Sequence, residues 1–202
     1  MTNEAFDVEI EALVRPPVTF DRAKVLSRPS PVPPAPGVYA WYFHGMAKTV
    51  PFEGTHASDD GHLLYVGISP KAPSRDGLRI SRQSLRTRVR YHFRGNAAGS
   101  TLRLTLGSLL AEELGIQLRR VGSGQRLTFS DGEAKLSDWM AGHARVCWVA
   151  TPAPWTLESA LITQLTLPLN LDQNVTSGFR EQLSALRAHQ RLTARELPVI
   201  PR

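Results

Sequence analysis

The sequence predicts a small mixed α/β fold, in which a central and mostly antiparallel β-sheet is flanked by helices. Two short runs rich in β-branched and aromatic residues, 37–43 and 63–68, are joined by a polar loop, which is typical of an antiparallel pair of strands. A third run, 144–150, is almost continuously apolar at its centre and predicts a central, buried strand. Helical patterns stand between and after these runs.

Length and composition set the limits of this fold. The chain has 202 residues, which is enough for one domain with a core and additional arms. Hydrophobic residues make up 42% and charged residues 21%, as in ordinary soluble proteins. No apolar run approaches the roughly 20 residues that a membrane span needs. The N-terminus lacks the layout of a secretory signal and Cys147 is the single cysteine, so we expect a cytoplasmic protein without a membrane partner.

The first predicted helix follows the second strand. Leu85, Val89 and Phe93 recur at i, i+4 and i+8, which predicts a helix over 82–95 with this stripe buried. Leucines continue over 102–120 and predict another helix that ends near Gly115.

Shorter elements follow in the second half of the chain. A hairpin is expected within 125–133, with its turn at Asp131-Gly132, and Ser137 is expected to cap a short helix. Pro154 opens a helix that must end before Pro168, and a last amphipathic helix is expected near 178–191.

The distribution of charge indicates the kind of partner. The net charge is +6 and the isoelectric point is near 10.0, which favours a polyanion. One segment holds eight arginines against the single acid Asp76: Arg75, Arg79, Arg82, Arg86, Arg88, Arg90, Arg94 and Arg103. The planar fork of arginine matches phosphate oxygens, so the segment predicts contact with a nucleic-acid backbone. The alternative is a solvated basic helix face.

Three further polar residues lie at the margins of apolar stripes. Arg88 and His92 are four residues apart, so their side chains share one face of the 82–95 helix at the edge of the core. Glu158 lies beside an apolar stripe in what we expect to be the first turn of its helix, where the helix dipole favours the ionised carboxylate. Such a carboxylate suits Mg²⁺ or Mn²⁺, which keeps most of its shell as water and phosphate. Asn170 follows twelve residues later and returns toward the same corner.

The order of these residues along the chain resembles the GIY-YIG nuclease family. The matching positions are Gly37-Val38-Tyr39, Tyr65-Val66-Gly67, Arg88-x-x-x-His92, Glu158 and Asn170. The Arg-x-x-x-His pair, the long insertion between the tyrosines and the run ESALITQLTLPLN are most similar to the restriction-endonuclease branch. The resemblance implies a GIY-YIG-like domain over 37–172, an N-terminal arm with a proline-rich tether over 1–36, and a helical extension over 173–202.

The resemblance also implies a hydrolytic mechanism. Glu158 would hold one Mg²⁺ or Mn²⁺ against a non-bridging oxygen and the leaving 3′ oxygen of the phosphodiester. Arg88 would present its guanidinium to the phosphate. Tyr39 would help to take the proton of the attacking water. A free tyrosine titrates near 10, so it needs neighbours that favour the phenolate, and His92, Arg88 and the field of the metal are the available helpers.

The remaining roles are less sharply divided. Tyr65 would orient the water or the phosphate, and the roles of Tyr39 and Tyr65 could be exchanged. Asn170 would hold the glutamate or the substrate in place. Phosphate contacts are expected from a set of basic side chains outside the catalytic group: Lys71, Arg79, Arg82, Arg86, Arg90 and Arg94.

Two departures from the family pattern stand out. Valine replaces the isoleucine of both tyrosine motifs, which is a conservative change in a buried strand. A long segment, about 96–143, is inserted between the Arg/His helix and the strand that leads to Glu158, and it has no counterpart in the pattern.

The sequence therefore predicts a metal-dependent endonuclease that hydrolyses DNA, with RNA left open as a substrate. The first alternative is a nucleic-acid-binding module with an idle nuclease site, and the second is a structural or protein-binding domain, which the arginine cluster disfavours. An enzyme that cuts both strands works as a symmetric dimer or visits its site twice, so a homodimer is one of two arrangements.

Overall fold

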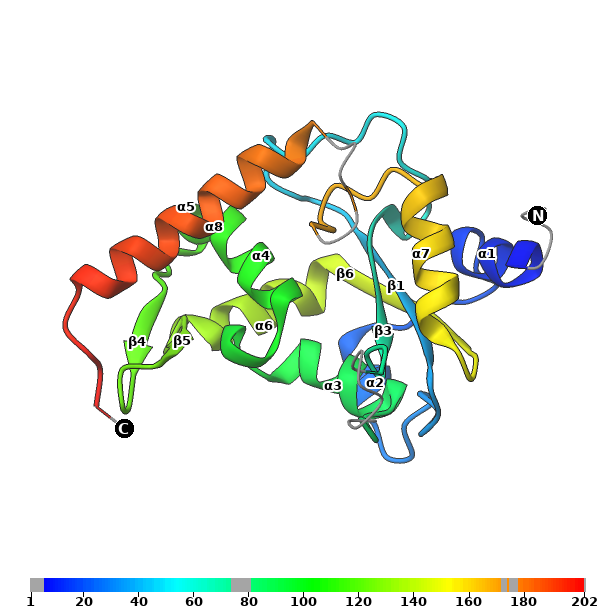
Figure 1. The fold of residues 1–202 in the computed structure, drawn as a ribbon, viewed down its shortest axis with the longest axis horizontal. Helices are drawn as coiled ribbons and strands as arrows, with labels where there is room; N and C mark the ends of the chain where they lie inside the picture. The colour runs from blue at the N-terminus through cyan, green and yellow to red at the C-terminus, as the bar shows by residue number, and fades with distance from the viewer. Residues whose placement is uncertain (1–5, 74–80, 172–173, 175–177, 202) are drawn as a thin grey trace.

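The computed structural model describes residues 6–73, 81–171, 174 and 178–201. Within these residues, eight α-helices and a four-stranded antiparallel sheet form the mixed α/β fold that the sequence predicts (Figure 1). A separate two-stranded hairpin lies at the far end of the molecule, next to the last helix (Figure 1). None of the described helices is long and apolar enough to cross a membrane.

The four-stranded sheet has the strand order β2-β3-β1-β6. Its strands are β1 (Gly37–Phe43), β2 (Ala57–Ser58), β3 (Gly61–Ser69) and β6 (Ala144–Ala150). The expected antiparallel pairing of the two tyrosine strands is confirmed: Tyr39 lies opposite Gly67, and Trp41 lies opposite Tyr65. A Cβ at Gly67 would come within 2.6 Å of the Tyr39 hydroxyl oxygen, so this glycine makes room for the tyrosine.

The position predicted for the third strand was wrong. The central, fully buried strand is β1, which pairs with β3 on one side and β6 on the other. β6 is an outer strand, and its free edge receives only a single bridge, between Phe20 and Val146, within the described residues. The apolar run at 144–150 reflects packing on both faces of an edge strand, which sequence alone does not distinguish from a central one.

The two faces of β1 build two separate cores. Tyr39, Trp41 and Phe43 point to the side covered by α3, α4 and α6, whereas Val38, Ala40 and Tyr42 point to the side covered by α1 and α7 (Figure 1). The alternation follows from the two-residue period of a strand, and all six side chains are buried. Both layers together hold β1 at the centre of the domain.

The predicted helices are present, with bounds that differ from the expected ones by a few residues. The predicted buried stripe Leu85, Val89 and Phe93 is fully buried. Pro154 opens α7 as expected. The bounds are α1 (Asp7–Val14), α2 (Arg22–Leu26), α3 (Leu85–Arg94), α4 (Thr101–Leu109), α5 (Ala111–Leu114), α6 (Gly132–His143), α7 (Pro154–Gln164) and α8 (Phe179–Glu196).

The inserted segment is where the local predictions were least accurate. The helix expected over 102–120 is split into α4 and α5, although it ends at Gly115, whose φ of 57° is left-handed. The hairpin consists of β4 (Arg119–Val121) and β5 (Arg126–Thr128), so its turn lies at 122–125 and not at Asp131-Gly132. Asp131 instead precedes the first residue of α6. The glycines of the VGSGQR turn have the positive φ angles of a tight turn, which the Asp-Gly pair was expected to supply.

Ser137 does not cap a helix as expected. It lies inside α6 and is buried, and its hydroxyl donates a hydrogen bond of 2.8 Å to the Glu133 carbonyl one turn earlier. The same oxygen accepts a hydrogen bond of 3.1 Å from Arg103 Nη1. Ser137 therefore stabilises a buried polar group instead of the end of a helix.

The described part of the N-terminal arm packs into the domain. Leu13 and Val25 are fully buried, and the hydroxyl of Tyr42 in β1 donates to the Leu13 carbonyl at 2.7 Å. Phe20 bridges β6 and stacks on Trp148 with 4.5 Å between the ring centroids. The arm thus covers the outer strand and one end of the second core.

Candidate active site

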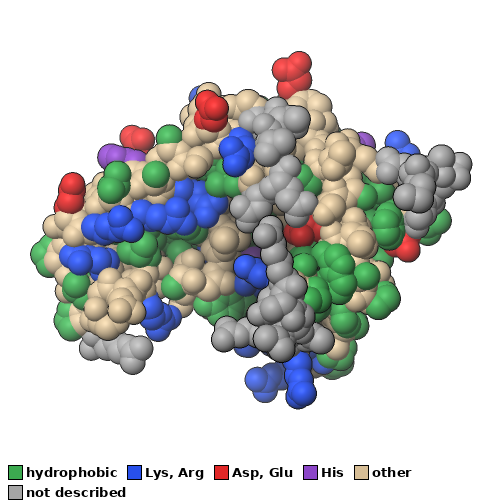
Figure 2. All heavy atoms as spheres, in the orientation of Figure 1, with side chains coloured by type: hydrophobic (Ala, Val, Ile, Leu, Met, Phe, Trp, Pro, Cys, Tyr) green, Lys and Arg blue, Asp and Glu red, His purple; other side chains and the backbone are tan. Residues whose placement is uncertain are grey.

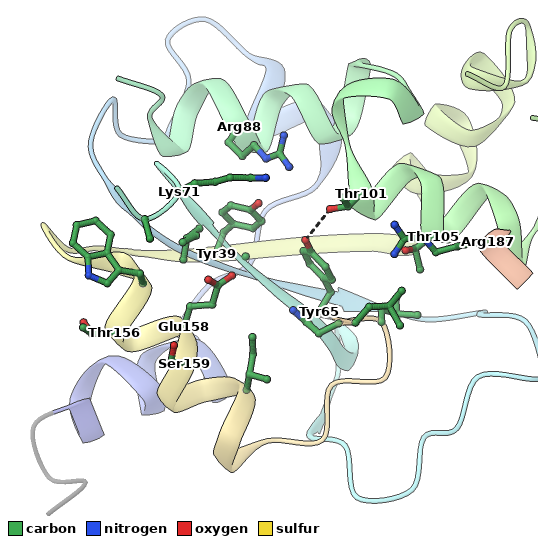
Figure 3. Close-up of a pocket in the computed structure, with 18 residues that line it drawn as sticks. Tyr39, Tyr65, Lys71, Arg88, Thr101, Thr105, Thr156, Glu158, Ser159 and Arg187 are labelled. Carbon is green, nitrogen blue, oxygen red and sulfur yellow. Dashed lines mark hydrogen bonds between the residues drawn. The ribbon is translucent and has the colours of Figure 1, made fainter. Parts of the chain in front are cut away.

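A cavity of about 790 Å³ opens between the tyrosine strands, α3, α4 and α7 (Figure 3). Five of the six predicted catalytic residues line it, and the sixth, His92, lies directly behind Tyr39. The five are contributed by β1, β3, α3, α7 and the segment after α7: Tyr39, Tyr65, Arg88, Glu158 and Asn170. The fold therefore brings residues from positions 39 to 170 to one corner.

Tyr39 stands at the closed end of the cavity. Its ring is buried, with 1% of its surface exposed, and its hydroxyl oxygen lies 2.9 Å from His92 Nε2. Burial raises the pKa of Tyr39 well above its ordinary value, and the neighbouring Tyr65 adds to the rise, whereas the Arg88 cation lowers it. In the free protein Tyr39 is therefore a neutral phenol at physiological pH.

His92 connects Tyr39 to the inserted segment. Its Nδ1 lies 2.7 Å from the hydroxyl oxygen of Ser100, which also accepts a hydrogen bond of 3.1 Å from the backbone N–H of Arg103. Burial lowers the pKa of His92 well below its ordinary value, and the Arg88 and Arg103 cations act in the same direction. The imidazole is therefore neutral.

The hydrogen bonds of Ser100 determine which nitrogen of His92 carries the proton. Ser100 is buried, and His92 Nδ1 is the acceptor that the described residues offer to its hydroxyl proton. With Nδ1 accepting, the proton of the neutral ring is on Nε2, and Nε2–H donates to the Tyr39 oxygen. In this tautomer His92 acts on Tyr39 as a hydrogen-bond donor, which favours the phenolate over the phenol.

Charged side chains enter the cavity from opposite walls. Figure 3 shows Arg88 and Lys71 on the α3 side and the Glu158 carboxylate on the α7 side, directed toward the tyrosines. Arg88 Nη1 donates to the Gly99 carbonyl at 2.7 Å, which fixes the direction of the guanidinium. Glu158 is the fifth residue of α7, so the expectation that it lies in the first turn was wrong, and the helix dipole supports its charge less than predicted.

Tyr65 and Asn170 form the third side of the cavity. The Tyr65 hydroxyl lies 3.5 Å from Thr101 Oγ1 (Figure 3). Asn170 Oδ1 accepts from the Val66 N–H at 2.9 Å, and Nδ2 donates to the Val66 carbonyl, also at 2.9 Å. The amide pairs with β3 in the way that a neighbouring strand would, and thereby fixes the strand beside Tyr65.

A family model described as the GIY-YIG catalytic domain matches residues 37–189. The chain belongs to the GIY-YIG family. Membership implies a nuclease-type hydrolase with a nucleic-acid substrate, and nucleases of this family generally depend on a divalent metal. No curated protein and no solved structure matched the chain. Neither the family match nor the described part of the chain supports a homodimer.

The GIY-YIG match extends beyond the expected end of the domain at 172 and into α8. Arg187 of α8 lines the cavity, so the C-terminal helix contributes to the site. The inserted segment contributes as well, through Ser100, Thr101 and Thr105. Sequence reasoning missed Ser100 and Thr101 because a serine or threonine at the beginning of a helix is first of all a capping signal, and Ser100 is indeed the N-cap of α4.

Of the six predicted phosphate contacts, the five that the structure describes separate into three groups. Lys71 lines the cavity, and Arg82 and Arg94 are exposed. Arg86 Nε donates to the Val32 carbonyl at 2.7 Å, and Arg90 Nη1 donates to the Val25 carbonyl at 3.0 Å, so both attach α3 to the N-terminal arm. Arg79 lies outside the described residues.

Arg103, the last arginine of the basic segment, does not face solvent. It is fully buried, and its Nη2 lies 2.7 Å from Glu133 Oε2. Its Nη1 donates to the His92 carbonyl at 3.1 Å. Arg103 therefore joins α3, α4 and α6 behind the site.

The donors around the cavity fit a hard divalent cation held by a single carboxylate. No group of three or more acidic, histidine or cysteine side chains that could hold a metal occurs among the described residues. Mg²⁺ is commonly bound through one or two carboxylates together with water and substrate phosphate. Glu158 is the carboxylate that lines the cavity, so it is the residue that would hold such an ion.

Proposed function

We propose that the protein is a divalent-metal-dependent endonuclease that hydrolyses phosphodiester bonds of DNA in the cavity between β1, α3 and α7. The observation that carries the proposal is the convergence of Tyr39, Arg88 and Glu158 on one cavity, with neutral His92 bound to the Tyr39 hydroxyl. Hydrolysis requires a base, a cation for the phosphate and a ligand for a metal. In this proposal Tyr39 is the base, Arg88 is the cation for the phosphate and Glu158 is the ligand for the metal.

Tyr39 is the proposed acceptor of the water proton. Its raised pKa means that the free protein holds the phenol, so the phenol must release its proton to solvent after substrate loading. Two groups of the chain favour that phenolate: the Arg88 cation and the Nε2–H of His92. The phenolate oxygen takes a proton from water, the oxygen of that water attacks phosphorus, and the bond from phosphorus to the leaving oxygen breaks. The leaving oxygen then takes up a proton from solvent.

The other residues bind the phosphate. The Arg88 guanidinium, held by the Gly99 carbonyl, donates to non-bridging oxygens, and Lys71 adds a second positive charge. Glu158 would hold the divalent cation, which supplies positive charge where the pentacoordinate phosphate and the leaving oxygen become negative. Tyr65 orients the phosphate or the water from the β3 side.

Asn170 acts as a positioning residue in this proposal. Both polar atoms of its amide are bonded to Val66, so it holds β3 and Tyr65 in place and does not reach for the substrate.

The test is a cleavage assay with purified protein. Supercoiled plasmid, linear duplex, single-stranded DNA and RNA are incubated with Mg²⁺, Mn²⁺ or EDTA, beside Glu158→Gln and the matched control Glu113→Gln, an exposed glutamate of α5. We expect metal-dependent cutting of DNA by the parent and by Glu113→Gln, and none by Glu158→Gln.

The other outcomes are decisive as well. Salt-sensitive binding without cutting of any substrate would replace the enzyme with a binding module whose site is idle. Equal cutting by the parent and Glu158→Gln would mean that the metal ligand is assigned to the wrong residue. A preference for RNA would keep the mechanism and change the substrate.

A further inference from the structure

One side of α8 carries a row of arginines that leads away from the cavity. Arg180, Arg187, Arg191 and Arg195 are separated by seven, four and four residues, so they lie on one side of the helix. Arg187 lines the cavity itself. Figure 2 shows Lys and Arg side chains gathered in a row below α8, with acidic and histidine side chains along its opposite edge. We call these four residues the arginine flank.

Three residues of the flank, Arg180, Arg191 and Arg195, form no ion pair with an acidic side chain among the described residues. No acidic residue stands three or four positions from any of these three along the helix. α4 and β4, the elements that pack most extensively against α8, contain no acidic residue either. The acids of α8, Glu181 and Glu196, project from its other sides.

The hairpin extends the positive surface beyond the end of α8. Arg120 of β4 donates through Nε to the Ala194 carbonyl at 3.2 Å and through Nη2 to the Leu197 carbonyl at 2.9 Å. These bonds place a fixed guanidinium at the C-terminal end of the helix and hold the hairpin against it. The positive surface is thus built on rigid secondary structure from the cavity outward.

We infer that the arginine flank binds the phosphate backbone of the substrate on one side of the bond that is cut; the inference rests on the proposed nuclease function. From Arg180 to Arg195 a helix rises about 22 Å, at 1.5 Å per residue. A duplex advances 3.4 Å per base pair along each strand, so the flank matches roughly six base pairs. The arginine flank recognises a regular row of phosphates and not a base sequence.

The test compares two variants that lose the same charge. In the Glu158→Gln background, Arg180→Gln, Arg191→Gln and Arg195→Gln are combined, and Arg187 is kept because it lines the cavity. The control combines Arg15→Gln, Lys48→Gln and Lys135→Gln, three exposed residues elsewhere on the surface. Binding to a long DNA duplex is measured over a range of salt concentrations.

We expect the flank variant to bind about tenfold more weakly at physiological salt, and its salt slope to become shallower by about 2.7, or 0.9 for each lost phosphate contact. The control variant should bind like the parent. The difference between flank and control should shrink on a duplex too short to reach beyond the cavity.

Equal losses in the two triple variants would overturn the inference, because the flank would then act only through net charge. If the protein with Glu158 intact cuts DNA while the flank variant binds like the control, the flank inference fails and the proposed function stands. If the parent neither cuts nor binds nucleic acid, both fail together.

Discussion

The two walls of the cavity differ in how their polar groups are used. On the α3 wall, Tyr39, His92 and Ser100 are buried and bonded to one another. On the α7 and α8 wall, Glu158 and Arg187 face the open cavity. A buried network is costly to leave incomplete, whereas a group beside water loses little when its partner changes. Substitutions on the first wall should therefore act on stability, and those on the second on substrate handling.

The largest expected effect comes from one substitution behind the α3 wall and one in the cavity itself. Glu133→Gln places amide protons against the guanidinium of Arg103, a fully buried cation, and should lower the free energy of unfolding by about 3–5 kcal/mol. Glu158→Gln should change it by less than about 1 kcal/mol and abolish cleavage. Urea denaturation and the cleavage assay measure the two quantities. A similar loss of stability in both variants would erase the distinction between the walls.

The next effect is a pH dependence of stability from His92. Burial lowers the pKa of His92 in the folded state. Below a pH of about 6.5 the unfolded chain therefore binds a proton at this histidine that the folded chain does not bind. Stability should therefore fall as the pH drops, by about 1.4 kcal/mol per pH unit, until the folded-state pKa is reached.

His92→Gln should remove this dependence, while His189→Gln, an exposed histidine of α8, should keep it. The measurement is the urea midpoint at pH values from neutral to mildly acidic. An unchanged pH slope in His92→Gln would show that other groups carry it.

A smaller effect is expected from Ser100→Ala. The change removes the N-cap of α4 and the hydrogen bond to His92 Nδ1, and should cost about 1–2 kcal/mol. If Ser100 has a purely structural role, this loss of stability is the only effect expected. A positioning role also predicts that the proton of neutral His92 is no longer held on Nε2, which nitrogen chemical shifts report directly. Ser100→Thr, which keeps a hydroxyl, should restore the Nε2–H form.

The smallest effects come from two arginines of α3 that the sequence treats alike. Arg90→Gln removes a side chain that donates to the Val25 and Ser27 carbonyls, and should lower stability by about 1 kcal/mol. Arg94→Gln, at an exposed site, should leave stability unchanged and weaken DNA binding slightly. Thermal unfolding and salt-dependent binding separate the two. Equal effects on stability would mean that α3 is not attached to the arm through Arg90.

Much of the fold follows from local pattern. The two tyrosine strands, the buried stripe of α3, the start of α7 at Pro154 and the end of α5 at Gly115 depend on periodicity and on proline and glycine stereochemistry. The order of the motif residues along the chain also indicates the family, and the match to the GIY-YIG catalytic domain confirms it.

Tertiary structure decided what each polar side chain contacts. Arg82, Arg90 and Arg103 belong to one basic segment, yet the first is exposed, the second binds the arm and the third is buried against Glu133. Asn170 was expected to hold the glutamate or the substrate in place, whereas its amide pairs with Val66. A helical or strand period states which face a residue occupies. It does not state which distant segment covers that face, and here that segment determines whether a charge binds substrate or stabilises the core.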